Sequence, residues 1–102
     1  MTLQELQNWV KNDWERHSKI QPNLADQLLF AIEEFGEVAE AIRKRTLKDD
    51  YKIDDNKLGP EFGDLIITIV TLANTFDVDL TQEVKGFQTK LLSRRAAEAN
   101  PQ

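Results

Sequence analysis

The chain has 102 residues, no cysteine and a formal net charge of −5. The length fits one domain covering residues 1–102, and the lack of cysteine excludes disulfides, thiolate zinc sites and a cysteine nucleophile. The negative charge, with no Lys/Arg stripe interleaved with aromatics, argues against a nucleic acid polymer as partner, and no segment resembles a signal peptide or a membrane span. We therefore expect a cytoplasmic protein, and one that forms homo-oligomers because a helical domain of this size gains much apolar burial by association.

The first predicted helix starts after Thr2 and ends near Ser18. Thr2 is a preferred N-cap residue, and Glu5 stands three positions later, at capping-box spacing. Apolar residues then recur near the helical period: Leu3, Leu6, Val10 and Trp14. We expect Trp9 to belong to the core and His17, the one histidine, to lie on the surface after the helix.

The second predicted helix, about residues 23–46, has two apolar stripes. The main stripe is expected to face the core of the monomer and consists of Leu28, Ile32, Phe35, Ala39 and Ile42. The other lies nearly opposite and brackets two acids between apolar residues: Phe30, Glu34, Glu37 and Ala41. Two apolar stripes imply two packing partners, with the acids of the second stripe inside the second contact.

Residues 48–57 are charged and lack apolar periodicity, which predicts an exposed loop. Pro60 then starts a third helix that runs to about Phe76. The β-branched run inside it favours a strand by propensity, but a Pro-initiated stretch of about 17 residues exceeds ordinary strand length. Its polar residues form a narrow stripe that we expect to be buried or to line a cleft: Glu61, Asp64, Thr68, Thr71 and Thr75. A fourth helix, capped by Asp79 or Thr81, completes an all-α fold of four antiparallel helices.

Two acidic motifs carry the strongest functional signal, EEFGE at 33–37 and EFGD at 61–64. In each motif two acids stand three residues apart, so their carboxylates lie on one helical face, a turn apart. Either motif alone would be ordinary on a helix surface, but no Lys or Arg occurs between Leu58 and Val84 to neutralise the second. Clustered carboxylates need a cation, and Mg2+ prefers oxygen ligands. The pattern predicts metal-assisted phosphate chemistry.

Each acidic motif also contains a glycine, Gly36 or Gly63. Glycine inside a helix costs about 1 kcal/mol relative to alanine. We therefore expect both acidic turns to approach another backbone closely.

The two motifs resemble the signature of the MazG-like all-α nucleoside triphosphate pyrophosphohydrolases, EExxE followed after a spacer by ExxD. Here 23 residues, 38–60, separate the motifs. The resemblance covers roughly residues 3–95 and extends to the acidic, Ala-rich segment 38–44 and the short link 74–80 into a last helix.

The resemblance implies hydrolysis of a nucleoside triphosphate to the monophosphate and pyrophosphate, with Mg2+, or Mn2+ in its place, as cofactor. Disposal of unwanted nucleotides is the implied role. By position, the metal ligands would be Glu34, Glu37, Glu61 and Asp64. Glu33 and Glu34 are the implied catalytic acids, and Glu33 would bind a second ion or orient the attacking water.

The resemblance also implies substrate contacts outside the acidic motifs. The last helix of the family often carries a basic residue followed by an Asn and an Arg that contact phosphates. Lys90 and Arg95 fit this pattern, whereas Arg94 stands where the Asn is expected. A solvated helix C-terminus explains these cations as well. Trp14 and His17 are candidates for the wall that binds the base.

Two alternatives stay open, and a third, a ferritin-like bundle, is disfavoured. A ferritin-like di-metal bundle typically uses Glu-x-x-His pairs, and His17 lies in neither acidic motif. Phosphoribosyl-ATP pyrophosphohydrolase is an all-helical relative with similar acids. A non-enzymatic oligomeric module could retain the acids as a metal or nucleotide site. Both a homodimer and a homotetramer agree with the sequence.

Overall fold

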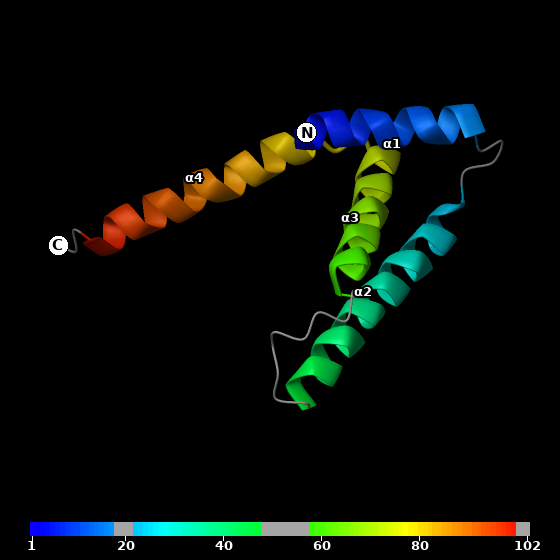
Figure 1. The fold of residues 1–102 in the computed structure, drawn as a ribbon. Coiled ribbons are helices and arrows are strands. Elements are labelled where there is room, and N and C mark those ends of the chain that lie inside the picture. The colour runs from blue at the N-terminus through cyan, green and yellow to red at the C-terminus, as the bar shows by residue number, and fades with distance from the viewer. Residues whose placement is uncertain (18–21, 48–57, 100–102) are drawn as a thin grey trace.

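The computed structural model describes residues 1–17, 22–47 and 58–99, and no strand occurs among them. Four helices follow one another (Figure 1): α1 Leu3–His17, α2 Leu24–Leu47, α3 Leu58–Thr75 and α4 Leu80–Ala99. The all-α fold class is confirmed, and the β-branched run of the third segment is helical as predicted. The predicted loop 48–57 lies outside the described residues. None of the described helices is long and apolar enough to cross a membrane.

Side-chain caps set the starts of three helices. Thr2 Oγ1 accepts a hydrogen bond from the backbone amide of Glu5 at 3.0 Å, and the Glu5 carboxylate accepts one from the amide of Thr2 at 3.4 Å, which confirms the capping box. Asn23 and Asp79 each accept a hydrogen bond from the amide three residues on, at 2.9 and 3.2 Å. Asp79, rather than Thr81, therefore caps α4. These caps satisfy amides that have no partner inside the helix.

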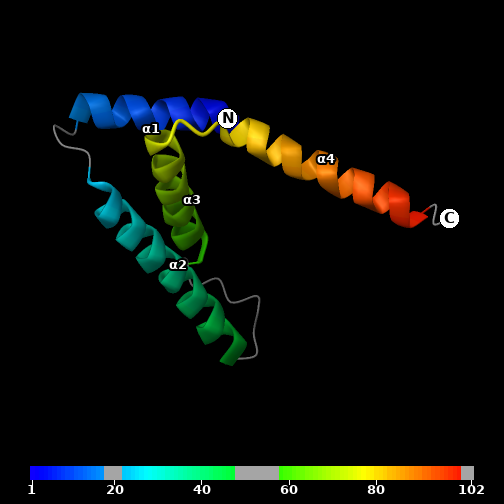
Figure 2. The same cartoon turned by 180° about the vertical axis from the view of Figure 1, so that it is seen from behind.

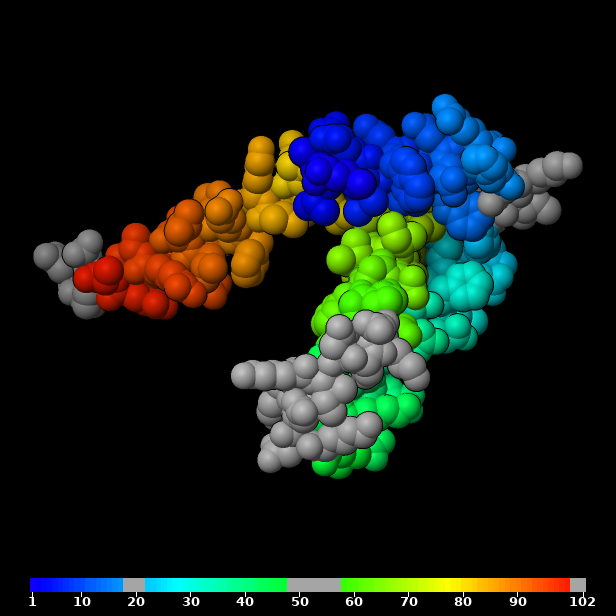
Figure 3. All heavy atoms as spheres, viewed as in Figure 1, coloured from blue at the N-terminus to red at the C-terminus, as the bar shows by residue number. Residues whose placement is uncertain are grey.

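The helices form an open arrangement rather than a closed bundle. α2 and α3 pack side by side as an antiparallel hairpin, α1 crosses the C-terminal end of α3, and α4 contacts α1. From both sides, α4 projects away from the hairpin (Figure 2). The space-filling view shows the same extended outline (Figure 3), which measures 58 × 40 × 26 Å. A bundle of four antiparallel helices is thus not confirmed by the single chain.

A polar junction fixes the direction in which α4 leaves. The buried Gln7 side chain donates hydrogen bonds to Asn74 Oδ1 at 3.1 Å and to the carbonyl of Val78 at 2.8 Å, and it accepts one from the amide of Leu80 at 3.1 Å. Asp77 adopts a φ of 53°, the left-handed conformation that ends α3. Because buried polar groups are costly without partners, this network holds the end of α3 and the start of α4 against α1.

The faces of α2 are arranged opposite to the prediction. The side that packs toward α3 carries the buried Gln27 and Val38 and the half-buried Glu34. The stripe expected to face the core is exposed: Leu28, Ile32, Phe35, Ala39 and Ile42. That prediction was wrong, because α3 turns its polar stripe toward α2, and the matching face of α2 is the one that contains the acid.

Few apolar side chains are fully buried among the described residues: Val10, Val38 and Val70. Trp9 was expected in the core, but it is 58% exposed. The reason is the rotation of α1, which directs Gln7 and Val10 toward α3 and leaves the neighbouring position outside. A single chain therefore buries little apolar surface.

Candidate active site

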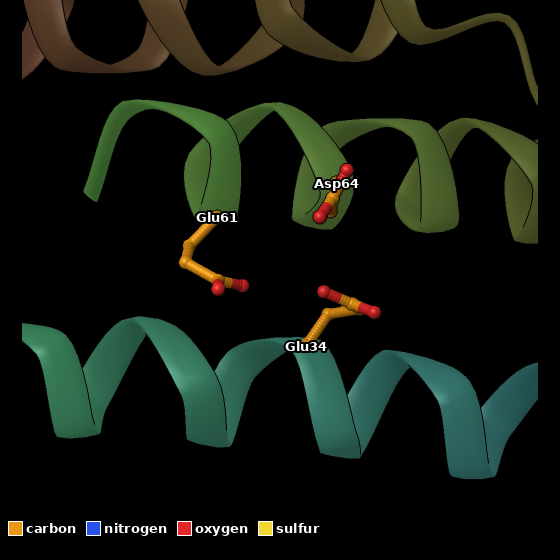
Figure 4. A group of neighbouring side chains, drawn as sticks. All are labelled: Glu34, Glu61 and Asp64. Atoms are coloured by element: carbon orange, nitrogen blue, oxygen red, sulfur yellow. The ribbon is translucent and has the colours of Figure 1, made fainter. Parts of the chain in front are cut away.

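Three carboxylates meet between the two helices of the hairpin (Figure 4). Glu34 projects from α2, and Glu61 and Asp64 project from α3, one turn apart. One oxygen from each lies within 4.8 Å of the others. Helical periodicity brings the acids of α3 to one side, and the antiparallel pairing places the acid of α2 opposite them.

The electrostatics of this carboxylate cluster are unfavourable without a cation. Burial raises the pKa of Glu34, and Glu37 and Asp64 raise it further. A hydrogen-bonding contact with Glu37 raises the pKa of Glu61, followed by burial. The effects that act on both carboxyls are thus burial and other acids, which all favour the protonated form.

Two carboxylate oxygens of the cluster lack a hydrogen-bond donor, which identifies the atoms that a cation would contact. Oε2 of Glu34 and Oε2 of Glu61 are shielded from solvent and accept no hydrogen bond from the described residues. A buried carboxylate oxygen without a donor costs free energy. Oxygen ligands are what Mg2+ prefers, so a divalent cation would satisfy both atoms and offset the clustered charge. The donor set fits such an ion.

The remaining acids of the predicted site flank the cluster. Glu37 is exposed on α2, and it acts on the pKa of both Glu34 and Glu61. Glu33 is also exposed, and its effect on the pKa of Glu34 is the weakest of those identified. The structure thus brings Glu34, Glu61 and Asp64 together and leaves the other two at the rim.

The expectation drawn from the two glycines is not met within the described part of the single chain. A Cβ atom added to Gly36 or Gly63 would meet no atom within 4 Å. Neither acidic turn therefore approaches another backbone of the described chain, and the cost of these glycines is not repaid by packing within the monomer.

The family-model comparison rests on the same part of the chain. The model described as MazG nucleotide pyrophosphohydrolase domain matches residues 22–97. The chain belongs to the MazG family. It is also similar to the uncharacterized protein YvdC of Bacillus subtilis (strain 168), with 28% identity over 102 residues, which cover 92% of this chain and 96% of that protein. No solved structure matches the chain significantly.

The MazG match includes both acidic motifs and most of α4, but it leaves out α1. The two predicted base-binding residues on α1 have different surroundings. Trp14 lines a pocket of about 220 Å3 that also contains Glu34 of the cluster. His17 is not among the residues that line this pocket, and its ring lies 3.2 Å from Asp13 on the exposed side of α1.

The pocket beside the cluster contains several residues that sequence reasoning did not assign to a site. Its walls come from the end of α1, the residue Pro22 before α2, the first half of α2 and the middle of α3: Trp14, Pro22, Gln27, Phe30, Glu34, Ile67, Thr68 and Thr71. The polar stripe of α3 had been expected to line a cleft, which Thr68 and Thr71 confirm. Gln27 was missed, although it stands seven residues before Glu34 and hence on the same helical face.

The predicted phosphate-binding cations are not near the cluster of their own chain. Lys90, Arg94 and Arg95 lie exposed on α4, which extends away from the hairpin. None of the three forms an ion pair within the described part of the chain. The MazG domain of one chain therefore presents the acids and these cations on separate elements.

Proposed function

We propose that this MazG protein hydrolyses nucleoside triphosphates, ribo or deoxy, to the monophosphate and pyrophosphate with Mg2+. The observation that carries the proposal is the carboxylate cluster, in which two shielded oxygens lack a donor and oxygens from three acids lie within 4.8 Å of one another. Family membership supports the reaction class, and the cluster supports a location for the reaction between α2 and α3.

Each acid has a defined task in the proposal. Glu34, Glu61 and Asp64 hold the divalent ion, and Glu37 completes the set from the rim. Bound there, the ion offsets the charge of the triphosphate and supplies Lewis-acid activation of phosphate and water. Glu33 and Glu34 act as the catalytic acids, with the exposed Glu33 orienting the attacking water. Mn2+ would replace Mg2+ at the same oxygen ligands.

The pocket beside the cluster is the proposed nucleoside site. It shares Glu34 with the cluster, so a ligand that fills it has its triphosphate next to the metal ligands. Trp14 and Phe30 supply flat apolar walls that suit a planar base. Lys90, Arg94 and Arg95 are kept as proposed phosphate contacts for the assembled oligomer only, because they lie away from the cluster within one chain.

The proposed oligomer uses the exposed side of the hairpin. On α2, the stripe that includes Leu28, Ile32 and Phe35 lies to one side of the residues that contact α3. On α3, Phe62 and Ile69 are displaced about the helix axis in the same direction from the residues that contact α2. In an antiparallel pair, such residues lie on the same side of the two-helix layer. All five side chains are between 44% and 68% exposed. We call this side the hairpin face.

A second copy is the proposed partner for the hairpin face. Exposed apolar patches of this kind mark interaction sites. If two copies join their hairpin faces around a two-fold axis, four antiparallel helices close over one core, two from each chain. The proposed oligomer therefore supplies the bundle that one chain lacks, as a dimer or as the building block of a tetramer. A cytoplasmic role in disposing of unwanted nucleotides is part of the same proposal.

The test is pyrophosphate release from a panel of ribo- and deoxyribonucleoside triphosphates and phosphoribosyl-ATP, with Mg2+ or with EDTA. We expect Mg2+-dependent pyrophosphate with an equal amount of monophosphate, and loss of both in the Glu61→Gln variant. Glu40→Gln is the matched control, because Glu40 is an exposed α2 acid that pairs with Lys44 at 3.4 Å. Mg2+-dependent thermal stabilisation without turnover of any nucleotide would contradict the enzyme and favour a binding module.

A further inference from the structure

The hydroxyl groups in the pocket beside the cluster have already used their hydrogens. Thr68 Oγ1 donates to the carbonyl of Asp64 at 2.8 Å, and Thr71 Oγ1 donates to the carbonyl of Ile67 at 2.9 Å. A hydroxyl has one hydrogen and two lone pairs. Each threonine therefore offers the pocket acceptor capacity and no donor.

The amide of Gln27 is held in one orientation. Its Nε2 donates to the carbonyl of Pro22 at 2.8 Å. Its Oε1 lies 2.8 Å from Thr75 Oγ1, whose single hydrogen is shared between this oxygen and the carbonyl of Thr71 at 3.1 Å. Because a carbonyl can only accept, the nitrogen must be the atom that faces Pro22. The side chain is only 4% exposed, so it is fixed at the pocket wall. One N–H and one lone pair of this amide are left for a ligand.

The polar wall of the pocket is therefore richer in acceptors than in donors. Thr68, Thr71 and Gln27 each contribute lone pairs, and among these three only Gln27 contributes an N–H. The indole of Trp14, which also lines the pocket, carries one further N–H. A ligand edge that fits this wall must place a hydrogen-bond donor against the two threonine hydroxyls. Cytosine and adenine carry an exocyclic amino group at the edge where uracil and thymine carry a carbonyl oxygen. A carbonyl placed there would face lone pairs and lose its hydration without compensation.

We propose that the pocket selects nucleobases with an amino group at the position of cytosine N4 or adenine N6, so that CTP and ATP are preferred to UTP. This inference rests on the proposed function, since it assigns the base specificity of the same site. Thr68 and Thr71 are the specificity residues that accept from the amino group. Gln27 donates to the adjoining ring nitrogen, while the apolar walls at Trp14 and Phe30 hold the ring plane.

The test compares kcat/KM for CTP and UTP, which share the ribose and the triphosphate and differ at the base edge. We expect a preference for CTP of about tenfold or more, the size typical for one buried hydrogen bond lost together with an unpaired acceptor. Thr71→Val keeps the branched shape and removes the acceptor, so the CTP/UTP ratio should fall toward one. Thr71→Ser keeps a hydroxyl and should restore it.

Thr46→Val is the matched control for these variants. Thr46 Oγ1 makes the same kind of bond, to the carbonyl of Ile42 at 3.0 Å, but Thr46 is exposed and outside the pocket. The CTP/UTP ratio of this variant should equal that of the wild type. A ratio that falls equally in Thr46→Val and Thr71→Val would overturn the assignment of specificity to the pocket.

Binding of the product nucleotides separates this inference from the proposed reaction. Calorimetry with CMP and UMP in EDTA requires no turnover. Tighter binding of CMP by the wild type, lost in Thr71→Val, supports the pocket. Equal turnover of CTP and UTP, or equal binding of CMP and UMP, overturns the base preference and leaves the hydrolysis intact. Absence of turnover with every triphosphate overturns the hydrolysis, and the CMP/UMP comparison still decides the pocket.

Discussion

The two faces of the α2–α3 hairpin differ in a way that is unusual for a small helical domain. The inner face, where the helices meet, contains Gln27, Glu34 and Glu61, together with the threonines of α3. The outer hairpin face is apolar, and Ile32 and Phe35 are 68% and 65% exposed there. Soluble proteins usually bury apolar side chains first. In this chain the more polar side faces inward.

This inversion separates two tasks that a single core would combine. The inner face places acids and hydroxyls in a partly shielded cleft, where a cation and a base edge interact strongly because water competes less. Such a core gives up stability, and burial of the exposed apolar side chains of the hairpin face in the proposed oligomer would restore part of it. Function of the inner face would then depend on association through the outer one.

The largest expected effect comes from Glu61→Gln on the inner face. Removing one metal ligand should lower kcat by about 100-fold or more, equivalent to about 2.7 kcal/mol of transition-state stabilisation. In EDTA the same variant should melt at a higher temperature than the wild type, because it relieves carboxylate repulsion. Activity assays and thermal melts measure the two changes. Unchanged turnover, or a lower melting temperature in EDTA, would contradict a metal-dependent inner face.

The next effect concerns the outer face. Phe35→Asp places a charge at the centre of the hairpin face and should weaken self-association by about 2 kcal/mol or more, roughly 30-fold in the dissociation constant. Sedimentation velocity measures this change, and circular dichroism checks that the helices remain. Leu29→Asp is the control, since Leu29 is 56% exposed but lies outside the hairpin face. Equal dissociation of both variants would remove the hairpin face as the specific contact.

Sequence reasoning predicted the elements better than their orientation. Local signals determine helix starts, so the predicted cap at Thr2, the predicted start of the second helix near Asn23 and one of the two predicted caps of the fourth helix, Asp79, agree with the structure. The spacing within each acidic motif is also a local, helical property, whereas the meeting of Glu34 with Glu61 and Asp64 depends on the antiparallel pairing of α2 and α3. By contrast, the face of α2 that turns inward depends on what α3 presents, and a helical wheel of one segment cannot supply that information.

The same distinction explains the other errors. Trp9 is exposed, and Gly36 has no close neighbour in the described chain. The predictions for both positions relied on average residue behaviour, because the rotation of each helix about its axis could not be known from its own sequence. Gln27 was missed for the opposite reason. Its position on the wheel relative to Glu34 was available, but a polar residue on a helix is usually assigned to solvent.

A smaller effect compares one apolar residue from each face. Val38 is buried at the inner face, and Val38→Ala should lower the free energy of unfolding by about 2 kcal/mol at any protein concentration. Ile42 lies on the exposed stripe at 44% exposure, so Ile42→Ala should cost little in the dissociated chain and more in the oligomer. Denaturant titrations at low and high concentration separate these cases. Concentration-independent losses for Ile42→Ala would place it in the monomer core instead.

The smallest expected effect is the pH dependence of stability without metal. The pKa values of Glu34 and Glu61 are raised in the folded state, whereas the unfolded chain titrates at the ordinary glutamate value near 4.5. Between the ordinary and the raised values the folded state binds more protons than the unfolded state, so stability falls as the pH rises through this window. In EDTA, the melting temperature of the wild type should therefore decline toward neutral pH relative to Glu34→Gln. With Mg2+ the sign should reverse, because the ion binds the deprotonated carboxylates. If the melting temperatures of the two proteins in EDTA changed equally with pH, repulsion among the carboxylates of the inner face would not contribute to the stability.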